Sequence, residues 1–376
     1  MKIAFICTEK LPVPPVAGGA IQLYISGILP WLSGRHDITV YGVQHPGLPN
    51  VETMDNVKYI RVPGKTDTLY VSSLKAALEP GFDLVHVFNR PRFMLALSDK
   101  FPETKFSLSL HNEMFHPEKI PDADALRCVK KAEFINTVSR FIADTVVKRV
   151  PEAEQKLRVV YSGADPLQYH VPWSPEGEAI KREIKLKYGL GDRKTVLYVG
   201  RLSVKKGVHV LLKAMEKIMS SRKDVALVVV GSKWYGNNEK DDYANSVLAA
   251  AKNLPGPVVL TGFVPPSEIP SLYNIGDIFV CASQWNEPLA RVHYEAMAAG
   301  LPIITTNRGG NAEVVEGYGN GIVINEYSDP SAFASTITQL LDDPVSVREM
   351  GMAGRKLAEE RFNWERVAAE VLGGQQ

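Results

Sequence analysis

Two glutamates, Glu287 and Glu295, stand eight residues apart in the second half of the chain. Pro288 suits the first position of a helix, and Gly300 with Pro302 ends one, so a single helix is expected to carry both carboxylates. At about 1.5 Å per residue, their backbone positions would lie roughly 12 Å apart on nearly one face of that helix. A nucleotide-sugar is of comparable length and could contact both.

The first turn of such a helix leaves backbone N–H groups unpaired and carries a partial positive charge, which suits a diphosphate. Glu287 could then accept hydrogen bonds from sugar hydroxyls, and Glu295 from the vicinal diol of a ribose. The alternative is that Glu287 caps the helix and Glu295 is solvated, which is the more common outcome for an arbitrary pair. Other residues must decide between the two.

A basic loop follows the strand expected at 195–199. Arg201 and Lys206 stand five residues apart in this loop and can converge on a diphosphate, Arg through its forked donors and Lys as a point charge. Basic residues on loops are usually solvated, so the pair alone is weak evidence for a diphosphate site. In the same domain as Glu287, however, it supplies the positive charge that a departing nucleoside diphosphate needs.

The first half of the chain offers a second group of candidates after its strands. Gly18 and Gly19 open a helix, where a backbone can approach a phosphate closely, although an ordinary turn is the alternative. His111 follows another strand and could contact a reacting sugar, although a lone His is more often a hydrogen-bonded structural residue. Asn89 and Arg90 follow a third strand and could touch an acceptor.

Other patterns point away from several kinds of chemistry. Neither half has a Gly-x-Gly-x-x-Gly turn, so a nicotinamide dinucleotide cofactor is poorly supported. Asp122 and Asp124 resemble a metal-binding pair, but they open a helix after Pro121, where acidic residues favour the helix dipole, and we expect no metal there. The backbone around Val264, in the loop at 261–265, could pair with the edge of a base.

The length and composition fit a two-domain globular protein. A chain of 376 residues suits two domains of roughly 150 to 200 residues each. Its 43 basic and 42 acidic residues nearly balance, so nucleic acid is not an expected partner. Cys7, Cys128 and Cys281 are widely spaced and are interpreted as reduced core residues, which favours the cytosol. The N-terminal apolar run of five residues is too short for a signal peptide or a membrane span.

Short β-branched runs alternate with helical patterns, which predicts parallel sheets built from βαβ units. Strands are expected at 3–7, 38–43, 58–62, 84–87, 106–110, 134–138 and 158–160, and again at 195–199, 226–230, 258–261, 278–281, 302–305 and 321–323. The fold class is therefore α/β, with two doubly wound, Rossmann-like domains. Ligands bind beyond the carboxyl ends of such strands, so we expect the two domains to face each other across a cleft. The closing segment 346–372 looks helical.

These motifs together resemble a known family. The run from Glu287 to Glu295, the segments 200–203 and 206–207, the Gly18 and Gly19 loop, His111, and the segments 262–264 and 309–310 resemble the retaining nucleotide-sugar glycosyltransferases of family four, which have a GT-B fold. The resemblance covers nearly the whole chain. Within the family, the segments 8–14, 111–115, 231–234 and 283–285 are similar to a spore-coat-associated branch.

The resemblance implies a role for each motif residue. Glu287 would contact donor sugar hydroxyls, Glu295 would bind the ribose diol, and Arg201 with Lys206 would hold the diphosphate. His111 would lie by the sugar. The implied catalytic residues are His111, Glu287, Arg201 and Lys206; the implied donor-binding residues are Gly18, Gly19, Arg201, Lys206, Val264, Glu287, Leu289, Ala290, Arg291 and Glu295; and the acceptor candidates are Asn89 and Arg90.

The implied domains are an acceptor-side domain at 1–165, a linker region at 166–190 and a nucleotide-sugar-binding domain at 191–359. A C-terminal helix at 360–376 would pack back on the first domain.

The chain departs from the family inside the main motif. Leu289 and Ala290 stand where the family commonly has Phe-Gly, and Arg291 stands where an aliphatic residue is usual. Ala290 keeps its backbone amide for donor contacts, whereas Arg291 would add a positive charge next to the donor. These changes leave the reaction plausible and the identity of the donor open.

The function expected from this resemblance is that of a retaining, metal-independent glycosyltransferase without a cofactor. It would move a hexose or N-acetylhexosamine from a nucleoside-diphosphate sugar, with a UDP-sugar favoured, to a glycan or lipid-linked acceptor in spore coat or cell-surface polysaccharide synthesis. The expected location is the cytoplasm, with contact to the spore coat or the periphery of a membrane left open. The alternatives are a catalytically silent coat protein of the same fold and a GT-B nucleotide-sugar epimerase.

Overall fold

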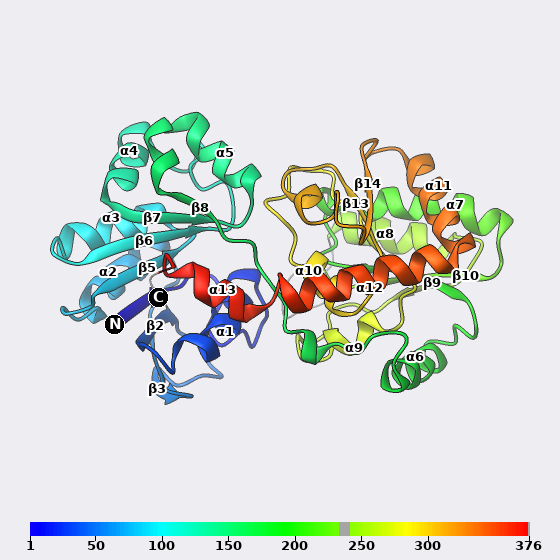
Figure 1. Cartoon of the computed structure of the whole chain (residues 1–376), viewed down its shortest axis with the longest axis horizontal. Helices are drawn as coiled ribbons and strands as arrows, with labels where there is room; N and C mark the ends of the chain where they lie inside the picture. The colour runs from blue at the N-terminus through cyan, green and yellow to red at the C-terminus, as the bar shows by residue number, and fades with distance from the viewer. Residues whose placement is uncertain (233–240, 375–376) are drawn as a thin grey trace. The chain divides into compact units, whose positions relative to one another are not determined.

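The computed structural model describes residues 1–232 and 241–374, and the chain forms two compact units (Figure 1). Unit 1 combines Met1–Ser162 with the C-terminal segment that begins at Trp364. Unit 2 is the continuous segment Gly163–Asn363. The segment 166–190, which the sequence analysis assigned to a linker, belongs to unit 2 and contains η2 (Pro166–Gln168) and α6 (Pro175–Lys187).

Unit 1 is built on one eight-stranded sheet with the order β3-β4-β2-β1-β5-β6-β7-β8. Its strands are β1 (Lys2–Ile6), β2 (Asp37–Val43), β3 (Val51–Met54), β4 (Val57–Val62), β5 (Leu84–Phe88), β6 (Lys105–Leu110), β7 (Ala132–Thr137) and β8 (Leu157–Val159). All neighbouring strands pair in parallel except β3, which pairs antiparallel with β4. The two are joined through Asp55 and Asn56, which both have positive φ values, as a tight hairpin turn requires.

Helices cover both faces of this sheet. They are α1 (Ala20–Leu32), α2 (Asp67–Ala77), α3 (Pro91–Lys100), α4 (Asp122–Lys131), α5 (Arg140–Arg149), η1 (Pro151–Lys156) and α13 (Trp364–Val371). Alternate residues of β1 serve the two faces, since Ile3 and Phe5 join the core under α1 and α13, whereas Ala4 and Ile6 join the core under α2 to α5. A central strand buried on both faces is a continuous apolar run, which is why the sequence revealed it.

The last helix of the chain completes unit 1. Helix α13 lies along α1 in Figure 1, and the ring of Trp364 packs directly on Gly27 of α1. A Cβ atom at Gly27 would lie 2.3 Å from this ring, so only glycine allows the approach. The predicted helical segment 346–372 is therefore two helices, and α13 is the part that belongs to unit 1.

Unit 2 is built on a six-stranded parallel sheet with the order β11-β10-β9-β12-β13-β14. Its strands are β9 (Lys194–Val199), β10 (Val225–Val230), β11 (Val258–Leu260), β12 (Ile278–Cys281), β13 (Ile303–Thr306) and β14 (Gly321–Ile324). Besides η2 and α6, its helices are η3 (Val204–Lys206), α7 (Val208–Ser221), α8 (Asp242–Lys252), α9 (Ile269–Tyr273), α10 (Val292–Ala298), η4 (Asn311–Val314), α11 (Pro330–Asp342) and α12 (Pro344–Glu360). Two α/β units with largely parallel sheets confirm the predicted fold class.

Every strand expected from the sequence is present, and its ends differ from the prediction by at most two residues. Among the strands of the described residues, β3 alone was not predicted, because this short strand, Val51–Met54, is mostly exposed and shows no apolar alternation. Cys7, Cys128 and Cys281 are free and buried, which confirms their interpretation as reduced core residues. Across residues 1–232 and 241–374, no helix is both long and apolar enough to cross a membrane.

A buried polar chain runs across the middle of the unit 1 sheet. The two ring nitrogens of His86, on β5, each lie 2.7 Å from a hydroxyl of β6, those of Ser107 and Ser109. Asn136 of β7 donates to the backbone oxygen of Val371 in α13 at 2.7 Å, and also reaches Ser109 at 3.5 Å. Burial lowers the pKa of His86 to about 3, with a further contribution from His111, so the imidazole is neutral in the folded protein.

Acid should therefore destabilise unit 1 through His86. The folded pKa lies below the unfolded value of about 6.5, so as pH falls below 6.5 the unfolded chain binds a proton that the folded chain rejects. The free energy of unfolding should fall with a slope that approaches about 1.4 kcal/mol per pH unit, until the folded pKa is reached. Urea unfolding at several pH values should show a shallower pH dependence in His86→Gln than in the wild type. Equal slopes in the two proteins would contradict this role of His86.

Candidate active site

Glu287 lies outside the helix that the sequence analysis predicted for it. Helix α10 begins at Val292, so the assignment of Pro288 to its first position was wrong, and the two glutamates do not share a helical face. Glu287 instead forms a parallel bridge with Gly309, and its carbonyl accepts a hydrogen bond from the amide of Gly310 at 2.8 Å. The backbone before α10 is therefore held by the loop after β13 and not by helical hydrogen bonds.

Two further contacts hold this segment against the β13 loop. A Cβ atom at Gly309, where φ is +62°, would lie 2.0 Å from the carbonyl oxygen of Glu287, so the approach requires glycine. The amide of Ala290 donates to the Oδ1 atom of Asn311 at 3.1 Å. The backbone amide of Ala290, which was predicted to contact the donor, therefore already has an acceptor within the protein.

Three donors converge on one oxygen of the buried Glu287 carboxylate. Its Oε2 atom accepts from Lys206 Nζ at 2.7 Å, from Trp285 Nε1 at 2.8 Å and from Ser283 Oγ at 3.0 Å. Burial alone would raise the pKa of Glu287, but the Lys206 ammonium and these hydrogen bonds outweigh it and hold the pKa below its usual value. The carboxylate is therefore ionised and its orientation is set through Oε2.

The loop that carries Lys206 is fastened to the loop that carries Glu287. A Cβ atom at Gly207, where φ is +74°, would lie 1.8 Å from the carbonyl oxygen of Ala282. The amide of Gln284 donates to the carbonyl of Lys205 at 2.8 Å, and the Lys205 ammonium lies 4.6 Å from the centre of the Trp285 ring. The loops after β9 and β12 thus form one cluster, in which Lys206 and Glu287 are in direct contact.

Glu295 lies in α10 and has its own partners. Its Oε2 atom accepts from the hydroxyl of Tyr273 at 2.9 Å, and Arg291 lies 3.4 Å from its Oε1 atom. Arg291 also donates to the carbonyl of Gly163 at 3.2 Å. The charge that Arg291 adds to the motif is therefore directed at Glu295.

The remaining predicted residues of unit 2 lie in loops at the same edge of the sheet. Arg201 is exposed in the β9 loop, and its carbonyl accepts from the Tyr198 hydroxyl at 3.1 Å. Val264 follows β11 and is half-buried, whereas Leu289 is buried. Two residues of the branch-specific segment 231–234, Lys233 and Trp234, lie outside the described residues.

In unit 1, Asn89 and His111 form a contact after neighbouring strands. The Oδ1 atom of Asn89 accepts from the backbone amide of His111 at 3.0 Å, and Asn89 has a positive φ of 57°, which Asn tolerates better than most residues. The ring of His111 meets Tyr24 edge to face, with 4.8 Å between centroids. Asn89 therefore positions His111 through its side chain.

Arg90, the second acceptor candidate, is paired with an acid that the sequence analysis did not single out. Its guanidinium makes two hydrogen bonds to the carboxylate of Glu9, at 2.7 and 2.8 Å. Burial alone would raise the pKa of Glu9, but the Arg90 guanidinium outweighs burial and lowers it. The pair is nearly buried, so Arg90 is largely neutralised within unit 1.

The predicted Gly18 and Gly19 loop is shaped by a buried glutamine. Both glycines have positive φ values, 84° and 108°, and a Cβ atom at Gly19 would lie 2.3 Å from Gln22 Oε1. The Nε2 atom of Gln22 donates at 3.1 Å both to Thr8 Oγ1 and to the carbonyl of Leu11. Gln22 therefore ties the start of α1 to the loop after β1.

Comparison with known proteins identifies the family. A family model described as glycosyl transferases group 1 matches residues 180–357. Spore coat protein SA of Bacillus subtilis (strain 168) is 44% identical to the chain, covering 99% of it and 98% of the relative. The putative glycosyltransferase YtcC of the same strain is also 44% identical, covering 99% and 91%. The chain belongs to the group 1 glycosyltransferases.

A solved structure supports the fold of this group 1 glycosyltransferase. Anabaena Alr3699/HepE, crystallised in complex with UDP-glucose, superposes with a TM-score of 0.79 at 20% identity, covering 99% of this chain and 98% of that one. The two α/β units therefore form a GT-B fold, as the sequence resemblance implied.

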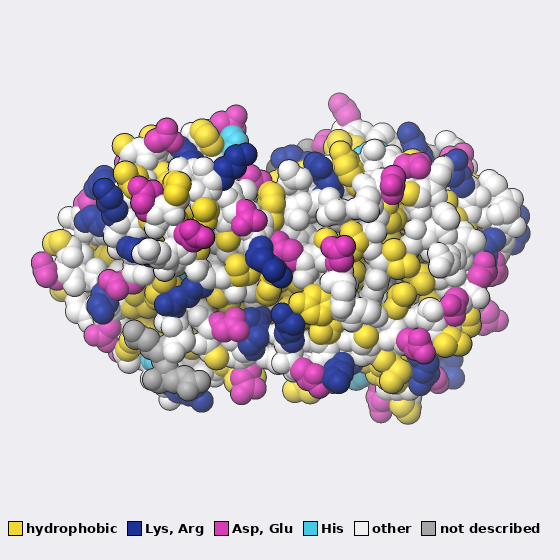
Figure 2. Space-filling view, turned by 45° about the horizontal axis from the view of Figure 1, so that its top comes forward, with side chains coloured by type: hydrophobic (Ala, Val, Ile, Leu, Met, Phe, Trp, Pro, Cys, Tyr) yellow, Lys and Arg dark blue, Asp and Glu magenta, His cyan; other side chains and the backbone are white. Residues whose placement is uncertain are grey.

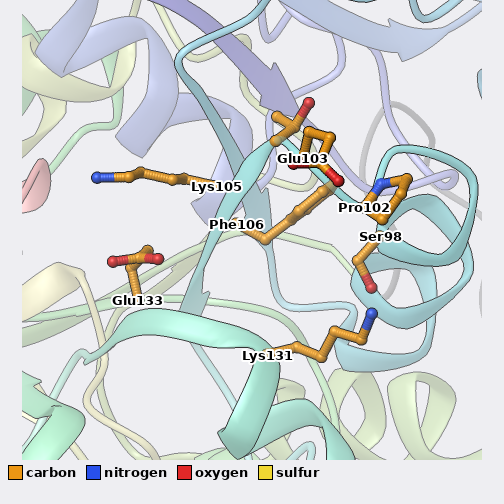
Figure 3. Close-up of a pocket in the computed structure, with 8 residues that line it drawn as sticks. Ser98, Pro102, Glu103, Lys105, Phe106, Lys131 and Glu133 are labelled. Atoms are coloured by element: carbon orange, nitrogen blue, oxygen red, sulfur yellow. The ribbon is translucent and has the colours of Figure 1, made fainter.

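Within unit 1, a pocket of about 180 Å³ lies away from His111, the candidate sugar contact of this unit (Figure 3). It is lined by residues at the amino ends of β6 and β7, among them Lys105 and Glu133, whereas His111 follows the carboxyl end of β6. The pocket and His111 are therefore at opposite ends of the strands of one sheet.

On the face drawn in Figure 2, basic and acidic side chains are interspersed, in agreement with the balanced composition.

Removing Lys206 should destabilise the glycosyltransferase, because it leaves the charged Glu287 carboxylate buried with neutral donors only. We expect Lys206→Met to lower the free energy of unfolding by about 1 to 3 kcal/mol at neutral pH. The loss should shrink as pH falls through the usual pKa of glutamate, about 4.3, because protonation then removes the buried charge. Urea unfolding measures both effects.

The control is the double variant Lys206→Met/Glu287→Gln, which removes the charge together with its partner. It should recover most of the stability at neutral pH. A single variant as stable as the wild type, or a double variant no better than the single one, would show that the pair does not hold this cluster together.

Proposed function

We propose that this glycosyltransferase is active and retaining, needs no metal, and moves a hexose or N-acetylhexosamine from a nucleoside-diphosphate sugar to a glycan or lipid-linked acceptor. The observation that supports the proposal best is the Glu287 carboxylate, which is ionised and oriented by three donors on Oε2. Within the described part of the chain, no residue donates to its Oε1 atom. A hydroxyl of the donor sugar can therefore bind there.

The charges of the cluster suit the bond that must break. Cleavage of the bond between the anomeric carbon and the diphosphate oxygen leaves negative charge on the diphosphate, and preorganised cations stabilise such charge. Lys206 and Arg201 belong to one loop at the carboxyl edge of the sheet, and we assign the diphosphate to them. Glu295, held by Tyr273, is assigned to the ribose diol.

Retention without a covalent enzyme intermediate requires the acceptor to attack the face from which the diphosphate departs. In the proposed step the acceptor oxygen bonds to the anomeric carbon, the bond to the diphosphate breaks, and the hydroxyl proton passes to an oxygen of the leaving diphosphate. Glu287 is assigned to sugar binding and not to attack. In unit 1, His111 is assigned to the sugar, with the Gly18 and Gly19 loop on the diphosphate and Asn89 and Arg90 near the acceptor.

A UDP-sugar is the favoured donor, because HepE, which shares the fold, was crystallised with UDP-glucose. A panel of nucleotide-sugars tests the proposal, with release of nucleoside diphosphate as the readout and the metal chelator EDTA present in a parallel series. We expect release with a UDP-sugar that is unchanged by EDTA. Absence of release and transfer with every donor would contradict the proposal, and dependence on added metal would contradict its metal-independent part.

A second candidate function is a coat component that has lost the reaction, since one relative at 44% identity is named a spore coat protein. Calorimetric titration with nucleoside diphosphates separates the two, because a purely structural protein should bind none. The ionised Glu287 supports the enzyme, because its three donors all bind Oε2, and Oε1 keeps an acceptor position for a sugar hydroxyl that a purely structural ion pair does not need.

Substitution of the two glutamates should have different effects. Glu287→Ala should mainly reduce turnover, because it removes the oriented contact to the reacting sugar, whereas Glu295→Ala should mainly weaken donor binding. A hydrogen bond to a charged group contributes about 1.5 to 3 kcal/mol, so each constant should change roughly 10- to 150-fold. Steady-state kinetics and calorimetry with the active donor measure the two constants. The control is Glu316→Ala, an exposed acid of unit 2, which should behave as the wild type.

A further inference from the structure

Arg308 lies in the loop after β13, next to the residue that pairs with the backbone of Glu287, and has no place in the function proposed so far. It follows the carboxyl end of β13 and directly precedes Gly309, whose backbone pairs with that of Glu287. The amide of Arg308 donates to the carbonyl of Thr306 at 2.8 Å, which fixes its backbone at this edge of the sheet. Arg308 therefore belongs to the loop that holds the proposed sugar-binding carboxylate.

The guanidinium of Arg308 is stacked but has no acceptor. Its central carbon lies 4.3 Å from the centre of the Tyr327 ring. Across residues 1–232 and 241–374, no side chain or carbonyl accepts a hydrogen bond from it, and its Nε atom is buried. Buried N–H groups are usually paired in folded proteins, and an anion at this guanidinium would supply the missing acceptor.

A second cation is held in the same manner close by. The side chain of Gln284 donates to the carbonyl of Tyr327 at 2.7 Å, while its amide donates to the carbonyl of Lys205 at 2.8 Å. Lys205 in turn lies over the Trp285 ring and has no carboxylate partner in the described part of the chain. Gln284 thus joins two cations, each over an aromatic ring and neither neutralised by an acid.

We propose that Arg308, assisted by Lys205, forms an anion subsite that recognises a carboxylate on the transferred sugar, as in a uronic acid. The inference rests on the proposed function, because it uses Glu287 as the binder of the sugar. Arg308 adjoins the Glu287 segment and not α10, which carries the ribose-binding Glu295, so the anion belongs to the sugar end of the donor. A planar guanidinium fork matches the two oxygens of a carboxylate, and stacking on Tyr327 orients it.

The test compares UDP-glucose with UDP-glucuronate, which differ only in the carboxylate at C6. Calorimetry should show that the wild type binds UDP-glucuronate more tightly by roughly 10-fold or more. Arg308→Gln should abolish this preference by weakening UDP-glucuronate alone, and Arg308→Lys should restore part of it. The control is Arg348→Gln, because Arg348 also lies over an aromatic ring, that of Trp173 at 5.8 Å, but is in α12. It should keep the full preference.

The outcomes separate this inference from the proposed function. If the wild type binds UDP-glucose and UDP-glucuronate equally, the inference fails while the proposed function stands. Equal weakening of both donors by Arg308→Gln also overturns it, since the arginine would then support the site without reading the carboxylate. If the wild type binds the two donors with equal affinity, but binds inorganic phosphate only when Arg308 is present, the anion subsite serves the acceptor. That result would overturn its assignment to the transferred sugar.

Failure of the wild type to bind any nucleoside diphosphate would instead remove the proposed function itself. If another base binds in place of uracil, the matched pair of hexose and hexuronate donors is made on that base, and the same outcomes apply.

Discussion

The buried negative charge of Glu287 is the constraint on which the candidate site depends. A carboxylate with so little exposure stays ionised only if cations and hydrogen-bond donors replace the water it has lost. Lys206 comes from the loop after β9, while Ser283 and Trp285 come from the loop after β12. Because the donors belong to different βα units, the charge can be stabilised only once the sheet has brought the strand ends together.

The close approach of loops to one another follows from the same constraint. For Lys206 to reach Glu287, the turn before α7 must touch the carbonyl of Ala282, and Gly207 is the residue without a Cβ atom at that contact. Gly309 does the same on the other side, against the carbonyl of Glu287. Glycines at these strand ends therefore shape the backbone, and through it they place the charged side chains.

The sequence predicted the parts of this arrangement that local pattern controls. Central strands such as β1 and β10 are buried on both faces, which makes them continuous apolar runs that need no knowledge of their neighbours. Strand β3 is short, exposed and paired only through its hairpin, so no such pattern marks it. The start of α10 was misjudged because Pro288 suits a helix, whereas the backbone at Glu287 bonds to a loop more than twenty residues away.

Candidate residues were recognisable as charges and glycines after strands, but their partners were not. In the sequence, Trp285 resembles an ordinary loop aromatic and Glu9 an exposed acid. The structure shows that the Trp285 indole donates to Glu287 and that the Glu9 carboxylate accepts from Arg90. Pairing decides what a charge at a strand end can do, because a guanidinium whose fork already holds a carboxylate has few donors left for a ligand. Arg90 is such a cation, whereas Arg308 is held on an aromatic ring and keeps its full charge for an anion.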